Sequence, residues 1–149
     1  ACDGQETICK LLLKNEAEVN IRNYMGFSPL HIACQYENVD IVNCLLAQKA
    51  NVNALLPDGS TPLHIACLYK QILAVEALLK NNANKNMKRA NGYTPLHEAC
   101  AQSFDKGLSC LIKYNVDVNL QDNKGNTPMH IASKMWNDNY LLHLLLENK

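Results

Sequence analysis

Apolar residues recur along this chain in short clusters at helical spacing, separated by polar stretches. In one cluster Ile41 and Val42 are followed by Leu45 and Leu46, which makes one face of a helix apolar. Ahead of each cluster stands a Ser or Thr followed by Pro, which is typical of a helix start because the hydroxyl can cap the first turn and Pro fits the first position. The pattern predicts four helix pairs, over 29–36 and 39–48, 62–69 and 72–81, 95–102 and 105–114, and 128–135 and 138–147.

The predicted pairs form an internal repeat without insertions. Four glycines, Gly26, Gly59, Gly92 and Gly125, lie 33 residues apart, and each precedes a Ser/Thr-Pro-Leu/Met-His-x-Ala segment. These segments, with the leucine-rich second helix and a closing Asn, resemble the ankyrin repeat over the whole chain. The resemblance implies an all-α solenoid, an L-shaped stack of helix pairs whose hairpin loops project to one side.

We expect one domain over residues 1–149. It comprises a partial repeat over 1–24, repeats over about 25–57, 58–90 and 91–123, and a C-terminal repeat over 124–149. Because the partial repeat begins after its inner helix, we expect the chain to be part of a longer protein. The family's Asp-x-x-Gly loop is kept at Asp122 but not at Leu56 or Arg89, so we expect those two turns to be looser or reshaped by function.

Composition narrows the function classes. Lys plus Arg and Asp plus Glu are both 14, so the chain lacks the net charge that attracts nucleic acids or anionic membranes. No apolar run approaches the ~18 residues of a membrane span. Seven cysteines without a C-x-x-C pair favour a reducing compartment, hence an intracellular protein, cytoplasmic or nuclear. We expect no cofactor and no small-molecule substrate.

A recurring H-x-x-C pattern is the main candidate for chemistry. His31 with Cys34 could place a nitrogen and a sulfur on one helical face, as could the equivalent pairs in the next two repeats. Stacked repeats are too far apart for a shared ~2.0–2.3 Å coordination shell, and the fourth copy has Ser133 in place of Cys. We therefore expect packing thiols and structural histidines, and the resemblance implies that each half-buried imidazole bonds neighbouring loops. No nucleophile, nucleotide-binding or metalloprotease motif is present, and we expect no enzyme.

The residues that break the repeat are the candidates for binding. The resemblance implies that hairpin tips and the exposed side of the inner helices line a concave groove that binds a protein or peptide. The candidates in or beside the hairpin tips and the exposed inner-helix positions are Tyr24, Met25, Phe27, Tyr36, Leu68, Tyr69, Tyr93, Glu98, Met135 and Trp136. The alternative is that the aromatic rings only cover helix ends and turns, and that Glu98 is solvated or paired internally instead of receiving a partner's cation.

Two further expectations remain open at this stage. The chain is predicted to be a non-catalytic interaction scaffold; it could also be the regulatory or targeting domain of a larger enzyme, channel or transcriptional regulator, or a spacer in a longer solenoid. Asn53 and Asn119 resemble sites of asparaginyl hydroxylation in this family, although turn formation by itself explains an Asn at these positions.

Overall fold

The computed structural model describes residues 7, 11, 15, 17–36 and 38–135. This part of the chain contains helices and turns but no strand. Its helices are α2 (Pro29–Gln35), α3 (Val39–Ala47), α4 (Pro62–Leu68), α5 (Ile72–Lys80), α6 (Pro95–Ala101), α7 (Asp105–Lys113) and α8 (Pro128–Met135). The predicted bounds are confirmed to within one residue for each of these helices, and the predicted helix over 138–147 lies outside the described residues.

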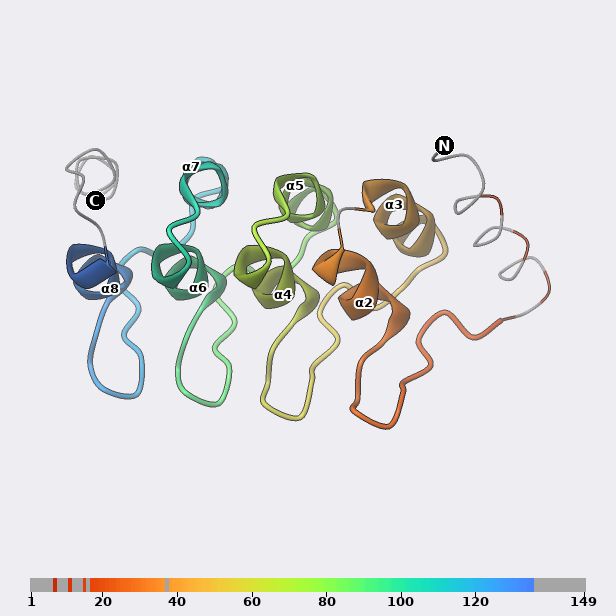
Figure 1. Ribbon diagram of the computed structural model, residues 1–149, viewed down its shortest axis with the longest axis horizontal. Helices are drawn as coiled ribbons and strands as arrows, with labels where there is room; N and C mark the ends of the chain where they lie inside the picture. Colours follow the sequence, from red (N-terminus) through yellow and green to blue (C-terminus); the bar gives the residue numbers. More distant parts are fainter. Residues whose placement is uncertain (1–6, 8–10, 12–14, 16, 37, 136–149) are drawn as a thin grey trace.

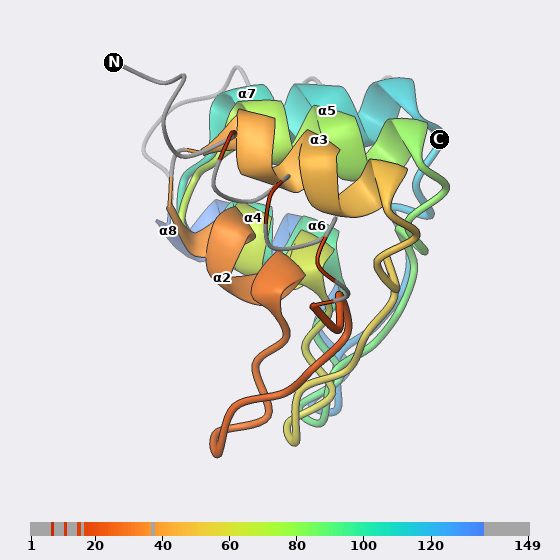
Figure 2. The same cartoon turned by 90° about the vertical axis from the view of Figure 1, so that its right-hand side faces the viewer.

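The helices form two parallel rows. The inner helices α2, α4, α6 and α8 make one row, and the outer helices α3, α5 and α7 lie along it (Figure 1). Long hairpins leave the inner row and all project to the same side, which gives the L-shaped cross-section seen from the end of the stack (Figure 2). The all-α solenoid predicted from the sequence is therefore confirmed.

The inner helices α2, α4 and α6 each start at a capping box. In α4, the hydroxyl of Thr61 accepts from the backbone N–H of His64, and the His64 ring accepts from the backbone N–H of Thr61. Pro62 occupies the first position, where a missing N–H costs nothing. The same local interactions start the other two helices, so the N-caps of α2, α4 and α6 are Ser28, Thr61 and Thr94.

The helix ends require left-handed backbone at residues other than glycine. The turn between α4 and α5 has Lys70 at φ 57°, and the turn between α6 and α7 has Ser103 at φ 50°. After α5, Asn82 has φ 61°, and the N–H of Ala83 returns to the carbonyl of Leu78, as in a Schellman motif. Lys70 and Ser103 thus adopt a backbone conformation that favours glycine, at a steric cost.

One continuous core lies between the two rows. Leucines of successive inner helices, Leu30, Leu63 and Leu96, are almost fully buried, and small Ala and Cys side chains beside them let neighbouring repeats approach closely. Since each repeat buries its apolar face against the next, the core extends along the stack and leaves the hairpins and one side of the inner helices free for other roles.

Candidate functional site

A histidine in the first turn of α2, α4 and α6 joins each of these helices to the next hairpin. Nδ1 of His64 lies 2.9 Å from the hydroxyl oxygen of Thr61, and Nε2 lies 3.0 Å from the backbone oxygen of Tyr93. Since a carbonyl only accepts, Nε2 carries the proton and the ring is neutral. The equivalent contacts join His31 to Ser60 at 3.4 Å and His97 to Asn126 at 3.0 Å. These contacts hold the hairpins in a row.

The H-x-x-C residues are structural. The rings of His31, His64 and His97 are buried, which corrects the expectation of half-buried imidazoles, and burial lowers the pKa of His64 to about 4. The partner thiols are also fully buried, and burial raises the pKa of each; they are Cys34, Cys67 and Cys100. A metal binds the thiolate, which this environment disfavours. The described ranges contain no group of three or more His, Cys, Asp or Glu side chains placed to hold a metal ion.

The hairpin turns have one geometry whatever residue begins them. In the turns that begin at Leu56, Arg89 and Asp122, the first residue donates to the carbonyl of the fifth, and the glycine donates to the carbonyl of the first, over 2.8–3.0 Å. Asp122 also accepts from two backbone N–H groups of its turn. Where this carboxylate is missing, Asp58 and Asn91 each accept from the N–H two residues on. The expectation that these turns are looser is therefore wrong.

A groove lies between the hairpins that contain Gly26 and Gly59 and the inner helix α4, and Arg89 of the next hairpin also lines it. It has a volume of about 320 Å³ and is lined by Met25, Phe27, Leu56, Pro57, Asp58, Ser60, Ile65, Leu68, Tyr69 and Arg89. Most of these side chains are apolar, and two of them remain open to solvent, since Met25 is 50% and Tyr69 44% exposed. The only charged lining residues are Asp58 and Arg89. The groove thus combines an apolar wall with one charged corner.

Four of the residues selected from the sequence line this groove: Met25, Phe27, Leu68 and Tyr69. The hydroxyl of Tyr69 accepts from the side-chain amide of Gln35 at 3.2 Å, so the ring bridges two repeats. Phe27 is half-buried, with its ring edge-on to His31 at a centroid distance of 6.0 Å. Phe27 therefore also covers its own turn, as the alternative reading expected.

Tyr24 and Tyr36 do not line the groove. Tyr24 is 97% exposed in a hairpin turn. Tyr36 lies beside Lys70 and Gln71 at a smaller hollow near the turns between inner and outer helices. Tyr36 and the equivalent Tyr69 therefore line different hollows, and a joint role of the two rings in binding stays a prediction.

Tyr93 and Glu98 belong to an internal cluster around Arg89. Nη2 of Arg89 lies 3.0 Å from Oε2 of Glu98, and Nη1 lies 3.5 Å from Oδ2 of Asp58. The guanidinium carbon stands 5.4 Å from the ring centroid of Tyr93, which itself stacks on His97. Glu98 is only 4% exposed. Of the two expectations for Glu98, internal pairing is the one present, and an open carboxylate awaiting a partner's cation is not.

The last two selected residues lie at the end of the described part of the chain. Met135 is the final residue of α8, and its side chain is not described. Trp136 lies outside the described residues.

The whole chain matches one known family. Residues 1–89 and 74–149 match the family described as ankyrin repeats (3 copies). The chain belongs to the ankyrin-repeat family. Ankyrin repeats are generally protein–protein interaction modules and are typically non-catalytic. No curated protein matches the chain. Within the described residues of this ankyrin-repeat chain, none of the helices has the length and apolar character needed to cross a membrane.

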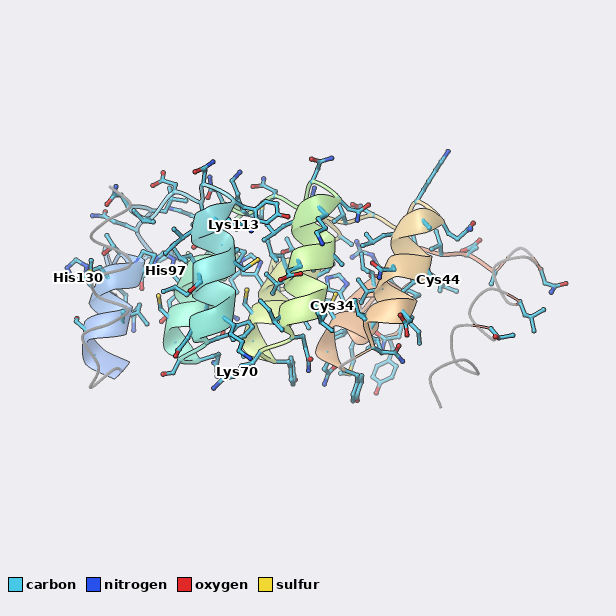
Figure 3. All side chains as sticks on the ribbon, turned by 90° about the horizontal axis from the view of Figure 1, so that it is seen from above. Cys34, Cys44, Lys70, His97, Lys113 and His130 are labelled. Carbon is cyan, nitrogen blue, oxygen red and sulfur yellow. The ribbon has the colours of Figure 1, made fainter. Side chains whose placement is uncertain are left out.

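The convex side of the ankyrin stack carries a larger hollow, of about 610 Å³, between α5 and α7. Figure 3 looks onto the outer helices and shows Lys113 on α7 and Lys70 at the turn end of the stack. The hollow is lined by charges of both signs on exposed or half-exposed helix faces, including Glu76, Asp105 and Lys113. Five of its nine lining residues are charged, and both signs are present, as on an ordinary solvated face.

The loop asparagines of the ankyrin repeats form a ladder. Oδ1 of Asn53 accepts from the N–H of Asn84 in the next repeat at 2.7 Å, and Asn20 and Asn86 make the equivalent bonds. Asn53 is half-buried and Asn119 is exposed. The side chain of Asn53 thus has a structural role, and modification of either residue stays a prediction.

Sequence reasoning missed Ile65, Pro57 and Arg89 as groove residues. A usable signal existed in two correlated departures: Leu56 and Ile65 are replaced 33 residues later by Arg89 and Glu98. Two positions nine residues apart that change together from apolar to oppositely charged indicate contact between them, and the ion pair confirms it.

Proposed function

We propose that this chain is a non-catalytic interaction module that binds a protein or peptide segment in the groove between its hairpins and α4. The observation that carries the proposal is the apolar wall formed by Met25, Phe27, Leu68 and Tyr69 beside a charged corner. Large, partly exposed apolar side chains in a concave surface are characteristic of interface hot spots.

Tyr69 is the residue on which we expect binding to depend most. An aromatic ring offers a large apolar area at a small entropic cost, and its hydroxyl keeps a polar contact. The hydrogen bond from Gln35 holds the ring in one orientation before any partner binds, so less freedom is lost on association. Tyr24, Tyr36 and Tyr93 are secondary candidates, because none of them lines the groove.

The test is selection of a displayed random-peptide library on the 149-residue chain. Peptides that are enriched are synthesised with a fluorophore, and their affinities are measured by anisotropy for the wild type and for Met25→Ser, Tyr69→Ala and Lys113→Ala. We expect Tyr69→Ala to weaken binding by ~2 kcal/mol or more, about 30-fold. Lys113→Ala is the control, since it removes an exposed side chain on the convex face.

Circular dichroism should show unchanged helicity for all three variants, because each replaced side chain is exposed. If enriched peptides bind the groove variants with wild-type affinity and lose affinity for Lys113→Ala, the binding surface is the outer helices and the proposal is wrong. A library that yields no specific binder also counts against it.

A further inference from the structure

The groove has a chemical preference that its charges define, and this inference rests on the proposed function. We propose that the groove selects a segment that places a Lys or Arg next to an apolar side chain, with the apolar group against Tyr69 and Leu68 and the cation at Asp58. The proposal names a partner of stated chemistry, a basic and apolar peptide segment, and it rests on charge complementarity.

The carboxylate of Asp58 is fixed in place at the rim of the groove. Its Oδ1 accepts from the backbone N–H of Ser60 at 3.0 Å, and its Oδ2 accepts from the Ser60 hydroxyl at 2.8 Å. The backbone oxygen of Asp58 accepts from the N–H of Ala90 in the next hairpin at 2.7 Å. The side chain is nevertheless 51% exposed. Asp58 is therefore both pre-organised and reachable by a partner.

One guanidinium serves two carboxylates at this corner. Arg89 is nearer to Glu98, at 3.0 Å, than to Asp58, at 3.5 Å. Glu98 is buried, so its close pair with Arg89 is shielded from solvent, and Glu98 compensates most of the Arg89 charge. With two negative groups and one positive group, the corner carries a net charge of minus one, and the uncompensated part lies on the exposed Asp58. A cation on the partner would neutralise the remaining charge of Asp58.

The ionisation of Asp58 agrees with this role. Partial burial opposes the charged form, but the hydrogen bonds from Ser60 and the charge of Arg89 outweigh it and hold the pKa of Asp58 below its usual value. The carboxylate is thus charged at neutral pH and available to an ammonium or guanidinium group.

The position of the buried pair points to recognition more than to stability. The preceding repeat places Leu56 and Ile65 at the corresponding positions, and both are buried apolar residues. A buried ion pair stabilises a protein no better than such an apolar pair does, and often less. The exchange of Leu and Ile for Arg89 and Glu98 brings no expected gain in folding, but it changes the polarity at one end of the groove and so distinguishes charged partners.

The test uses enriched library peptides and their charge variants. The basic residue of a groove-binding peptide is replaced by Gln or by Glu, and each peptide is titrated against the wild type and against Asp58→Asn. Asn keeps an oxygen that can accept from Ser60, so the turn is preserved while the charge is removed. Asp117→Asn is the matched control, because Asp117 accepts from the N–H two residues on in the same way, but in a loop that does not line the groove.

We expect enrichment of Lys or Arg at a fixed spacing from an apolar residue. Replacement of the cation by Gln should weaken binding to the wild type about three- to fivefold, the range of a partly exposed ion pair. Against Asp58→Asn the same replacement should have almost no effect, since the two groups are coupled. Asp117→Asn should bind as the wild type does, and added salt should reduce the preference for the cation.

The two proposals fail in different ways. If the selected peptides require Tyr69 but carry acidic residues, or show equal affinity with Lys, Gln and Glu, the charge preference is refuted and the groove remains the binding site. If binding is independent of Met25 and Tyr69, the proposed function itself fails, whatever the charge of the peptide.

Discussion

The ion pair between Arg89 and Glu98 gives a quantitative test of how this repeat is held together. The chain supplies its own reference, because the preceding repeat has Leu56 and Ile65 at the same positions. Three variants therefore follow: Arg89→Leu, Glu98→Ile and the double substitution. The double variant turns one repeat's charged pair into the apolar pair of its neighbour.

The expected magnitudes come from separation and burial. At 3.0 Å and an effective dielectric constant of about 20, the attraction between the two charges is ~5–6 kcal/mol. Desolvation of each ion costs several kcal/mol, so the net contribution of the pair is small. Arg89→Leu removes the attraction but leaves Glu98 buried. Loss of one partner of a fully buried pair costs ~3–5 kcal/mol; because the Arg89 side chain is 24% exposed, we expect about 2 kcal/mol.

The assay is urea unfolding followed by circular dichroism, with free energies from linear extrapolation. Arg89→Leu should lower the free energy of unfolding by ~2 kcal/mol, whereas the double variant should match or exceed the wild type. The double-mutant cycle then gives a coupling energy of ~2 kcal/mol or more between the two positions.

Two results would refute this reasoning. If Arg89→Leu is as stable as the wild type, Glu98 is not held in a poorly solvated site. If the double variant is less stable than either single variant, the apolar pair of the preceding repeat does not fit here, and the energetic argument for a role in recognition is lost.

Further predictions concern other parts of the stack. Burial lowers the pKa of His64 to about 4 from 6.5 in the unfolded chain, so the unfolded state binds more protons between these values and the protein becomes less stable as the pH is lowered. His64 alone should account for a loss of about 2 kcal/mol in the free energy of unfolding between about pH 7 and pH 5, measured by urea unfolding. No loss in this range would contradict a neutral buried ring. Gly107→Ala should destabilise by ~1–3 kcal/mol despite the better helix propensity of Ala, because its Cβ would clash with the ring of the buried Phe104. Thermal unfolding of the variant at the wild-type temperature would contradict this clash. Hydroxylation at Asn53 or Asn119 would appear as a +16 Da tryptic peptide from cells, and its absence on both residues would dispose of that prediction.

The spacing of residues along the chain was enough to determine the fold. Ser or Thr before Pro starts each inner helix through contacts within four residues, and the apolar spacing of the outer helices selects the buried face. Such signals are local, so they can be read without the tertiary structure, and the 33-residue repeat then places every unit against the next. The groove residues Met25, Leu68 and Tyr69 could be selected from the same 33-residue alignment of the repeats.

What the sequence could not determine depends on contacts between neighbouring repeats. Tyr36 and Tyr69 occupy equivalent positions, but Tyr69 lines the groove and Tyr36 lines a separate hollow, and no side-chain pattern reports that difference. Glu98 is paired internally because Arg89, in the hairpin that precedes α6, lies within 3.0 Å of its carboxylate. Burial and charge compensation are properties of atoms brought together in space. For that reason only the tertiary structure shows which of the candidate residues form one groove with an apolar wall and an acidic corner.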